Sequence, residues 1–375
     1  MKEEENMNIL ILGGTGAMGT YLQRLLDDGQ NKITVTSRKQ HVSERANILY
    51  EQGNAKELDF LSRLLRDEFD AIIDFMAYST EEFSQRYQLF LNATKQYIFI
   101  SSARVYAQSD APITEHTPRL LDVCKDQEYL NTDEYALAKA RCEDLLNRSG
   151  KKNYTIIRPS ITYGPERLQL GVLEKENWLY RALHGRSIVF SEDIASKLTA
   201  TTIGEDVAKG IAAITGQESA RGEAFHITCE TPHTWQEILQ YYLETLKKCG
   251  LNPKVVMTPK SLNLKLPGRK YQVIYCRYFN RRFDNSKIKK YLDVSAFTQP
   301  KDGLQECLQE FLKHPKFAII DWRLEALNDL AAHERTPLSE IPSLKSKLFY
   351  LSYRYHFEWL VLAMQKMKQL LRVGK

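Results

Sequence analysis

The sequence of 375 residues lacks the features that mark disulfide-stabilised and metal-binding proteins. Its six cysteines are scattered at positions 124, 142, 229, 249, 276 and 307, with no Cys-x-x-Cys pair. This pattern argues against a disulfide framework or a zinc site and favours reduced thiols. The eight histidines show no metal-ligand spacing either, so we predict no metal.

The chain also lacks long apolar runs and a targeting segment. No run approaches the roughly 20 apolar residues that cross a bilayer. The start, residues 1–6, is polar and has no apolar core of a signal peptide. We therefore expect a cytoplasmic protein.

Positive charge is concentrated near the C-terminus. The net charge is +5, but residues 343–375 contain seven basic residues and one acidic residue, so they carry +6 and residues 1–342 sum to −1. No nucleic acid is therefore expected on the body of the protein, whereas the tail has the charge to contact a polyanion.

Runs of strand length alternate with segments of helical periodicity through the first half of the chain. Strands are predicted over residues 7–12, 32–37, 70–77, 96–101 and 154–158, and helices over 20–26, 57–65, 83–93 and 133–146. This alternation predicts an α/β fold with a parallel sheet covered by helices on both faces. Gly13, Ala77, Ser102 and Arg158 fall at strand ends, so we expect them at the sheet edge that binds ligands.

Tyr135 and Lys139 lie four residues apart on a predicted helix. This spacing puts the phenol and the ammonium on one face, about one turn apart. A nearby cation favours the phenolate form of a tyrosine, so the pair predicts a proton donor or acceptor. Tyr and Lys also occur at this spacing by chance on many helices.

Three glycines, Gly13, Gly16 and Gly19, separate the first predicted strand from the first predicted helix. Missing side chains let a pyrophosphate approach the backbone, and the helix N-terminus supplies N–H groups and a positive dipole. The alternative is a tight turn without a ligand.

Four motifs occur in a defined order: Gly13-x-x-Gly16-x-x-Gly19, Ile100-Ser-Ser-Ala-Arg-Val-Tyr106, Tyr135-x-x-x-Lys139 and Arg158-Pro-Ser-Ile-Thr-Tyr-Gly-Pro165. Over about residues 7–313 the chain thereby resembles the extended short-chain dehydrogenase/reductases. This NAD(P)-dependent epimerase/dehydratase family acts mainly on nucleotide sugars. The resemblance implies a Rossmann-like, doubly wound parallel sheet with a smaller C-terminal substrate domain.

The resemblance also implies domain bounds and residue roles. The nucleotide-binding domain is expected over 1–165 with 199–228 returning to it, the substrate domain over 166–198 and 229–313, and a helical, basic extension over 314–375. Catalysis is assigned to Ser102, Tyr135 and Lys139, and substrate binding to Ser102, Tyr163 and Arg282. Predicted cofactor contacts are Gly13, Thr15, Gly16, Ala17, Met18, Gly19, Ser37, Arg38, Lys39, Ala77, Tyr135, Lys139 and Arg158.

The end of the second strand predicts which cofactor is used. Sites for NAD usually place a carboxylate there on the ribose 2′-hydroxyl, but this strand ends Ser37-Arg38-Lys39. A guanidinium suits a 2′-phosphate, so NADP(H) is predicted, with NAD as the alternative. A solvated basic loop is the competing interpretation.

One departure from the family pattern restricts the reaction. Family members that eliminate water from a hexose carry an acid pair directly after the catalytic Ser or Thr, but Ala103 and Arg104 stand there. We therefore expect reduction of a keto-sugar, or epimerisation through a transient ketone, rather than a 4,6-dehydratase. The expected setting is surface polysaccharide synthesis.

A basic, aromatic segment is the predicted source of substrate contacts. It contains Arg269, Lys270, Tyr271, Tyr275, Arg277, Tyr278, Phe279, Arg281 and Arg282. Arginines suit a diphosphate and aromatic rings suit a stacked base. An exposed strand explains the same pattern equally well, and Arg282 is our preferred residue.

The tail contains one apolar stripe at helical spacing: Leu344, Leu348, Leu351, Tyr355, Trp359, Leu362 and Leu370. Packing on the body or on another subunit of a homodimer is the favoured interpretation, because residues 357–364 are apolar nearly all round. Contact of tail residues 343–375 with an anionic membrane surface is the alternative. A second function hypothesis is a non-catalytic fold member that binds RNA or a protein.

Overall fold

The computed structural model describes residues 6–357 and 359. The chain divides into two compact units, which we describe separately. Unit 1 is the described part of Met1–Glu166 together with Leu198–His233 and Phe279–Gly303. Unit 2 is Arg167–Lys197, Thr234–Tyr278 and the described part of Leu304–Lys375. This division differs from the predicted bounds at two places: residues 279–303 group with unit 1, and the described residues from 314 group with unit 2.

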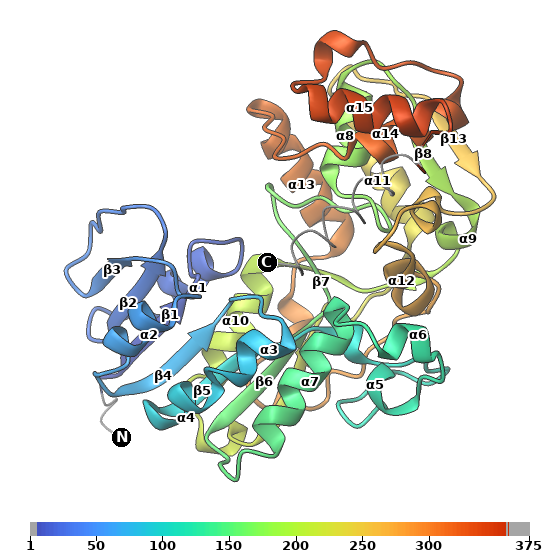
Figure 1. Cartoon of the computed structure of the whole chain (residues 1–375). Helices are drawn as coiled ribbons and strands as arrows, with labels where there is room; N and C mark the ends of the chain where they lie inside the picture. Colours follow the sequence, from blue (N-terminus) through green and yellow to red (C-terminus); the bar gives the residue numbers. More distant parts are fainter. Residues whose placement is uncertain (1–5, 358, 360–375) are drawn as a thin grey trace, which may run out of the picture. The chain divides into compact units, whose positions relative to one another are not determined.

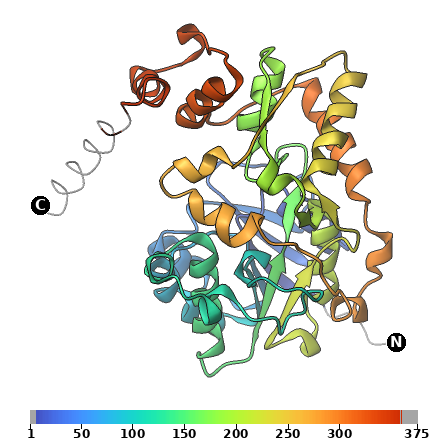
Figure 2. The same ribbon diagram turned by 90° about the vertical axis from the view of Figure 1, so that its right-hand side faces the viewer.

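Unit 1 is built on a seven-stranded parallel sheet with the order β11-β6-β5-β4-β1-β2-β3 (Figures 1 and 2). Its strands are β1 (Asn8–Leu12), β2 (Lys32–Ser37), β3 (Ile48–Gln52), β4 (Phe69–Asp74), β5 (Thr94–Ile100), β6 (Tyr154–Pro159) and β11 (Glu223–Ile227). The chain runs outward from β1 in one direction and from β4 in the other. This doubly wound topology reverses between β1 and β4, where such sheets bind ligands at the carboxyl ends of their strands.

The helices of unit 1 cover both faces of this sheet. They are α1 (Gly19–Leu26), α2 (Leu58–Leu64), α3 (Thr80–Ser84), α4 (Tyr87–Asn92), α5 (Leu120–Val123), α6 (Gln127–Leu130), α7 (Tyr135–Asn147) and α10 (Gly204–Ile214). A smaller ladder pairs β7 (Ile161–Tyr163) with β10 (Thr201–Ile203).

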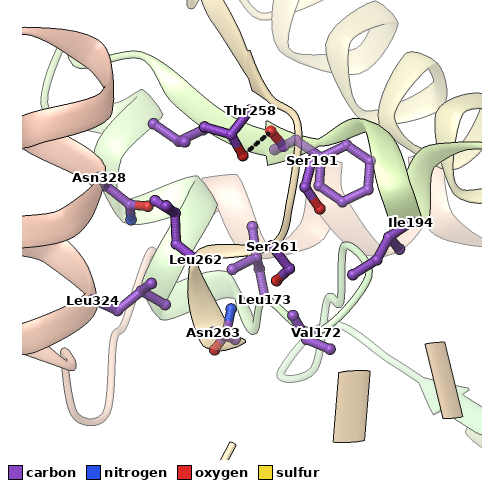
Figure 3. A pocket seen from close by; sticks show the side chains of 12 residues that line it. Val172, Leu173, Ser191, Ile194, Thr258, Ser261, Leu262, Asn263, Leu324 and Asn328 are labelled. Carbon is purple, nitrogen blue, oxygen red and sulfur yellow. Dashed lines mark hydrogen bonds between the residues drawn. The ribbon is translucent and has the colours of Figure 1, made fainter. Parts of the chain in front are cut away.

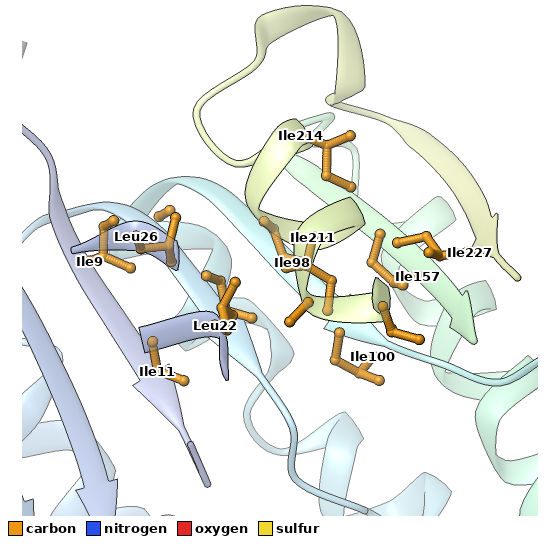
Figure 4. Close-up of a cluster of buried hydrophobic side chains, with 14 of the residues drawn as sticks. Ile9, Ile11, Leu22, Leu26, Ile98, Ile100, Ile157, Ile211, Ile214 and Ile227 are labelled. Carbon is orange, nitrogen blue, oxygen red and sulfur yellow. The ribbon is translucent and has the colours of Figure 1, made fainter. Parts of the chain in front are cut away.

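Alternating side chains divide the core of unit 1 into two layers. Ile9 and Ile11 of β1 join the layer that contains α1 and α10, which Figure 4 shows. Leu10 and Leu12 of the same strand point to the opposite layer, beneath α4 and α7. Because both faces of each central strand are buried, these strands are continuously apolar in the sequence.

Two elements of unit 1 differ from the prediction. β3 was not predicted, because it is a short edge strand with mostly exposed side chains. The helix expected over 83–93 is two short helices, α3 and α4, which are separated at Arg86, where φ is −132°.

Unit 2 combines helices with a two-stranded parallel ladder of β8 and β13. Its elements are α8 (Lys175–Leu183), β8 (Ile188–Ser191), α9 (Glu192–Ala195), α11 (Trp235–Lys248), β13 (Val255–Thr258), α12 (Lys270–Gln272), α14 (Trp322–Ala332) and α15 (Leu344–Arg354). α13 (Pro300–Lys313), β9 (Leu198–Thr199) and β12 (His233–Thr234) lie at or across the unit boundaries in the sequence.

A buried charge cluster fixes α8 to α14 within unit 2. The Arg181 guanidinium is fully buried and contacts carboxylates of Glu325, Asp329 and Glu334 at 2.7 to 2.8 Å. Its Nε also donates to the Ser187 carbonyl at 2.8 Å. Such a cluster holds a fixed geometry only while every partner is present.

The tail helix α15 packs within unit 2 through its tyrosines. Its buried face contains Tyr350 and Tyr353, and the Tyr350 hydroxyl donates to Asp329 Oδ2 at 2.7 Å. Within the described chain, Leu344 and Leu348 of the predicted stripe are instead 80% and 60% exposed. Leu362 and Leu370 of the stripe lie outside the described residues.

Candidate active site

The turn between β1 and α1 leaves an open backbone surface at the sheet edge. Gly13 has φ of 69°, which favours glycine, and its N–H donates to Thr36 Oγ1 at 3.0 Å. A Cβ on Gly19 would approach the Gly14 carbonyl oxygen to 2.3 Å, so only glycine allows α1 to start this close to the turn. A Cβ on Gly16 would meet nothing within 4 Å. Thr15, Gly16 and Ala17 are exposed.

This geometry fits the pyrophosphate of a dinucleotide. The open space at Gly16 gives a phosphate access to the backbone, and α1 begins at Gly19, so the positive end of its helix dipole lies at this turn. Met18 directly precedes the helix and is half-buried. Ala77, three residues after β4, is exposed.

The loop that follows β2 contributes to a cavity. Thr15, Ser37, Arg38, Lys39 and His41 line a cavity of about 460 Å³. Arg38 and Lys39 are exposed, and Ser37 Oγ accepts a hydrogen bond from the Lys39 N–H at 3.2 Å. Two cationic side chains and no carboxylate line this cavity, which suits a phosphate more than a ribose hydroxyl.

Ser102 directly follows β5, whereas Tyr135 and Lys139 lie on α7, and a hydrogen bond from Lys139 to Ile100 connects α7 to the end of β5. Ser102 follows β5, and its Oγ accepts a hydrogen bond from the Arg104 N–H at 3.2 Å. Tyr135 is the first residue of α7 and is 41% exposed. Lys139, one turn later, is buried, and its Nζ lies 6.0 Å from the centre of the Tyr135 ring.

The Lys139 ammonium is fixed by contacts with β5. It donates to the Ile100 carbonyl at 2.7 Å and lies 4.5 Å from the centre of the Phe99 ring. An ammonium has three donors, so two remain for a ligand such as a ribose hydroxyl.

Asp74 at the end of β4 is a second buried charge in this region, and the sequence analysis missed it. It accepts hydrogen bonds from the Tyr97 hydroxyl at 2.7 Å and the Met76 N–H at 2.9 Å. Burial raises the pKa of Asp74 to about 6, although Tyr97, Met76 and the charge of Lys139 act in the opposite direction. In the sequence Asp74 stood inside the strand predicted over 70–77, and its place at the strand end became evident only because β4 ends at Asp74.

Arg104 lies two residues after Ser102 and contacts Tyr135. Its guanidinium carbon lies 5.2 Å from the centre of the Tyr135 ring. It forms an ion pair with Glu134, whose Oε2 also accepts the Ala136 N–H at 2.9 Å. Sequence reasoning used Arg104 only as a missing acid and did not predict this contact with Tyr135.

Two predicted contact residues are engaged inside unit 1. Arg158 is buried, bonds Glu143 at 2.7 and 2.9 Å, and covers the Tyr106 ring at 4.9 Å. Glu143 also accepts the Ser101 hydroxyl at 2.6 Å, which separates Ser101 in role from Ser102. Tyr163 is 1% exposed and packs so closely on Gly303 that a Cβ there would lie 2.2 Å from its hydroxyl. The geometry therefore favours a structural role for Arg158 and Tyr163.

Three arginines of the basic, aromatic segment are engaged within their own units. Arg277 is buried and donates to the Gly171 carbonyl at 2.8 Å, while Arg269 pairs with Asp321 at 2.8 Å. Arg281 is also buried and donates to backbone carbonyls. Arg282 donates to the Asp110 carbonyl at 2.6 Å. Its side chain is exposed, so the guanidinium remains accessible.

Unit 2 contains a cavity beside β8 and β13, which Figure 3 shows. Ser191, Thr258, Asn263 and Asn328 contribute polar groups to its lining, and Thr258 donates to the Phe190 carbonyl at 3.2 Å. Its volume of about 10 Å³ holds about one water molecule and no sugar.

Comparison with known proteins extends this geometry. Residues 9–227 match the family described as "NAD dependent epimerase/dehydratase family". Over 240 residues the chain is 30% identical to the chloroplast stem-loop binding protein of 41 kDa b from Arabidopsis thaliana, covering 59% of this chain and 58% of that protein. Over 250 residues it is 22% identical to 2'-dehydrokanamycin reductase from Streptomyces kanamyceticus, covering 64% of this chain and 66% of that protein. The alignments thus span less than two thirds of either relative.

Among solved structures, the fold is similar to that of UDP-N-acetylglucosamine 4-epimerase from Methanobrevibacter ruminantium M1, determined in complex with UDP-N-acetylmuramic acid. The TM-score is 0.62 at 16% identity, covering 82% of this chain and 99% of that chain. At this identity the likeness confirms the Rossmann-like α/β fold.

Proposed function

Since the chain belongs to the NAD dependent epimerase/dehydratase family, we propose that it reduces or epimerises a nucleotide sugar with NADP(H). The observation that supports this proposal most is that Tyr135 and Lys139 lie one turn apart on α7 while Lys139 bonds the end of β5, the strand that Ser102 follows. A tyrosine hydroxyl, a serine hydroxyl and a lysine ammonium at one site suit proton transfer at a carbinol or carbonyl oxygen.

Each side chain has one role in this proposal. Tyr135, the most exposed of the three, gives or takes the proton at the sugar oxygen. The Ser102 hydroxyl orients that oxygen. Lys139 holds the ribose of the nicotinamide nucleotide with its two remaining donors. When bound, the nicotinamide supplies or accepts the hydride.

The cavity after β2 supports NADP(H) over NAD(H). Arg38 and Lys39 reach this cavity without a neighbouring carboxylate to reject a 2′-phosphate. A bidentate guanidinium–phosphate contact would then supply the selectivity.

The surroundings of Arg104 support reduction or epimerisation over elimination of water. Elimination needs an additional acid or base beside Ser102, and Ala103 cannot supply one. Arg104 is permanently charged and is paired with Glu134. Glu134 also accepts a hydrogen bond from the Ala136 N–H and so caps the start of α7. Its carboxylate is therefore engaged in structural contacts.

A second candidate function is RNA binding, which the relative named as a stem-loop binding protein favours. The charge of −1 over residues 1–342 (+5 overall less +6 in the tail) gives the body no basic surface for RNA. The complete set of Ser102, Tyr135 and Lys139 also favours catalysis.

Product analysis tests the two candidates directly. UDP-, dTDP- and GDP-linked sugars are each incubated with the full chain and NADPH, NADH or no added nucleotide. Stoichiometric loss of NADPH with a reduced sugar indicates a reductase, and a new diastereomer without net NADPH loss indicates an epimerase. A product that has lost water would contradict the proposed reaction. Inactivity on all sugars, with tight binding of an RNA stem-loop, would favour the second function.

A further inference from the structure

The C-terminal helix α15 presents an apolar surface to solvent. Leu344, Leu348, Tyr355, Phe357 and Trp359 are between 51% and 80% exposed. The first two lie on α15 opposite its buried tyrosines, and the other three follow directly after the helix. Exposed large apolar side chains that gather in one segment mark a contact surface.

Packing within unit 2 orients this surface outward. α15 lies against α14 (Figure 1), with Tyr350 and Tyr353 buried on that side. The Tyr350 hydroxyl bonds Asp329 of the Arg181 cluster, so the inner face of α15 is fixed by a buried polar contact. The helix therefore cannot turn Leu344 and Leu348 inward without losing this contact.

Basic side chains accompany the apolar ones. Lys345, Lys347 and Arg354 lie on α15 between and beside the exposed leucines. The sequence continues this composition, so residues 343–375 carry seven basic residues against the single Glu358. The described surface thus combines leucine, tyrosine and tryptophan with three basic side chains.

We propose that this segment, the described residues 344–357 and 359, binds the surface of an anionic lipid bilayer. Leucines enter the acyl boundary, tyrosine and tryptophan lie at the headgroup level, and lysines contact lipid phosphates. Within the described residues, no helix is both long and apolar enough to cross a bilayer. The contact is therefore attachment along the surface.

Charge and apolarity argue against two other binding partners, a second copy of the chain and RNA. A second copy would bring three basic side chains of the same segment against three, and residues 1–342 of another copy carry a net charge of only −1. RNA would satisfy the lysines, but phosphates and bases offer no apolar phase for Leu344 and Leu348. A lipid surface satisfies both sets of side chains.

Co-pelleting of the full chain with vesicles tests this proposal. The probes are phosphatidylcholine vesicles with and without phosphatidylglycerol, at low and at high salt. We expect binding only to the anionic vesicles and weakening by salt, because the basic residues supply attraction that salt screens. No binding to the anionic vesicles would overturn the proposal.

Two matched pairs of variants locate the contact. Leu344→Gln with Leu348→Gln removes apolar contacts, and its control is Val123→Gln with Ile319→Gln, two exposed residues elsewhere. Lys345→Glu with Lys347→Glu reverses charge, and its control is Lys254→Glu with Lys260→Glu. Each tail pair should weaken anionic-vesicle binding by about tenfold or more, and each control should leave it unchanged.

Sedimentation velocity and RNA binding are measured on the same proteins. If the leucine variant changes oligomeric state while vesicle binding stays at the wild-type level, the segment is a subunit interface and the proposal is wrong. If the lysine variant loses RNA binding but keeps vesicle binding, the proposal is also wrong. An unchanged NADPH affinity and tryptophan emission show that each variant is folded.

Discussion

Replacing Asp74 by asparagine should remove a pH dependence from the stability of unit 1. Burial raises the pKa of this carboxyl from 3.8 to about 6 in the native protein. The native state therefore binds a proton at a pH where the unfolded chain has lost it. Linkage then requires the free energy of unfolding to fall as pH rises from about 4 to about 6, and this contribution is constant above that range.

The size of the effect follows from the two pKa values. The difference between about 6 and 3.8 corresponds to about 3 kcal/mol, at about 1.4 kcal/mol for each pKa unit. Asparagine has no proton to lose at this position. The variant should therefore gain about 3 kcal/mol relative to wild type between pH 4 and pH 7. Any constant cost from a weakened Tyr97 contact cancels in this comparison.

The assay must report on unit 1 alone. All four tryptophans, at positions 178, 235, 322 and 359, belong to unit 2, so their fluorescence follows the wrong part of the chain. Pulsed hydrogen exchange along a urea series, read on peptides from β4 and β5, gives the stability of the sheet at each pH. His226 is also buried with a lowered pKa, but it is common to both proteins. Parallel curves for wild type and Asp74→Asn would refute the reasoning.

Three further changes test the other parts of the account. Arg38→Ala should weaken NADPH binding roughly ten- to hundredfold with little effect on NADH, because only NADPH has the 2′-phosphate. Arg63→Ala is the exposed control. Equal losses of affinity for both nucleotides in a titration would contradict the assignment. Gly16→Val should leave the melting temperature unchanged, because a Cβ there meets no neighbour, yet weaken nucleotide binding about tenfold or more by filling the phosphate space; unchanged binding would exclude this turn as the phosphate site. Arg181→Leu should lower the free energy of unfolding of unit 2 by about 3 to 5 kcal/mol, because buried carboxylates lose their cation. Urea unfolding followed by tryptophan fluorescence measures this. Arg335→Leu, at an exposed position, is the control, and an equal loss there would show that the cluster is not responsible.

The sheet of unit 1 was predictable because its strands are short, apolar and separated by helices. β2 has the predicted bounds, and β1 starts one residue later than predicted. β3 was missed because an edge strand buries little and need not be apolar. The division of the chain into two units was harder to predict from the sequence, because residues 279–303 contact segments that are far away in the sequence.

The site was predictable where a motif fixes a local geometry. Tyr135 and Lys139 share one helix, so their proximity follows from helical spacing. The contact of Arg104 with Tyr135 joins two segments, and no sequence period predicts it. The stripe did not identify the face of α15 that packs within the chain, because Tyr350 and Tyr353, between and beside its leucines, form that buried face.

The most direct test of the central claim is turnover by Tyr135→Phe beside a matched hydroxyl deletion, Tyr291→Phe. Both lose one phenolic hydroxyl, but the Tyr291 hydroxyl only bonds Ser219 on the surface of unit 1. On the sugar identified in the product screen, Tyr135→Phe should bind NADPH normally and lose about 10²- to 10⁴-fold in kcat, because the transferable proton is gone. Tyr291→Phe should keep wild-type turnover. Wild-type turnover by Tyr135→Phe would contradict the assignment of this site as catalytic.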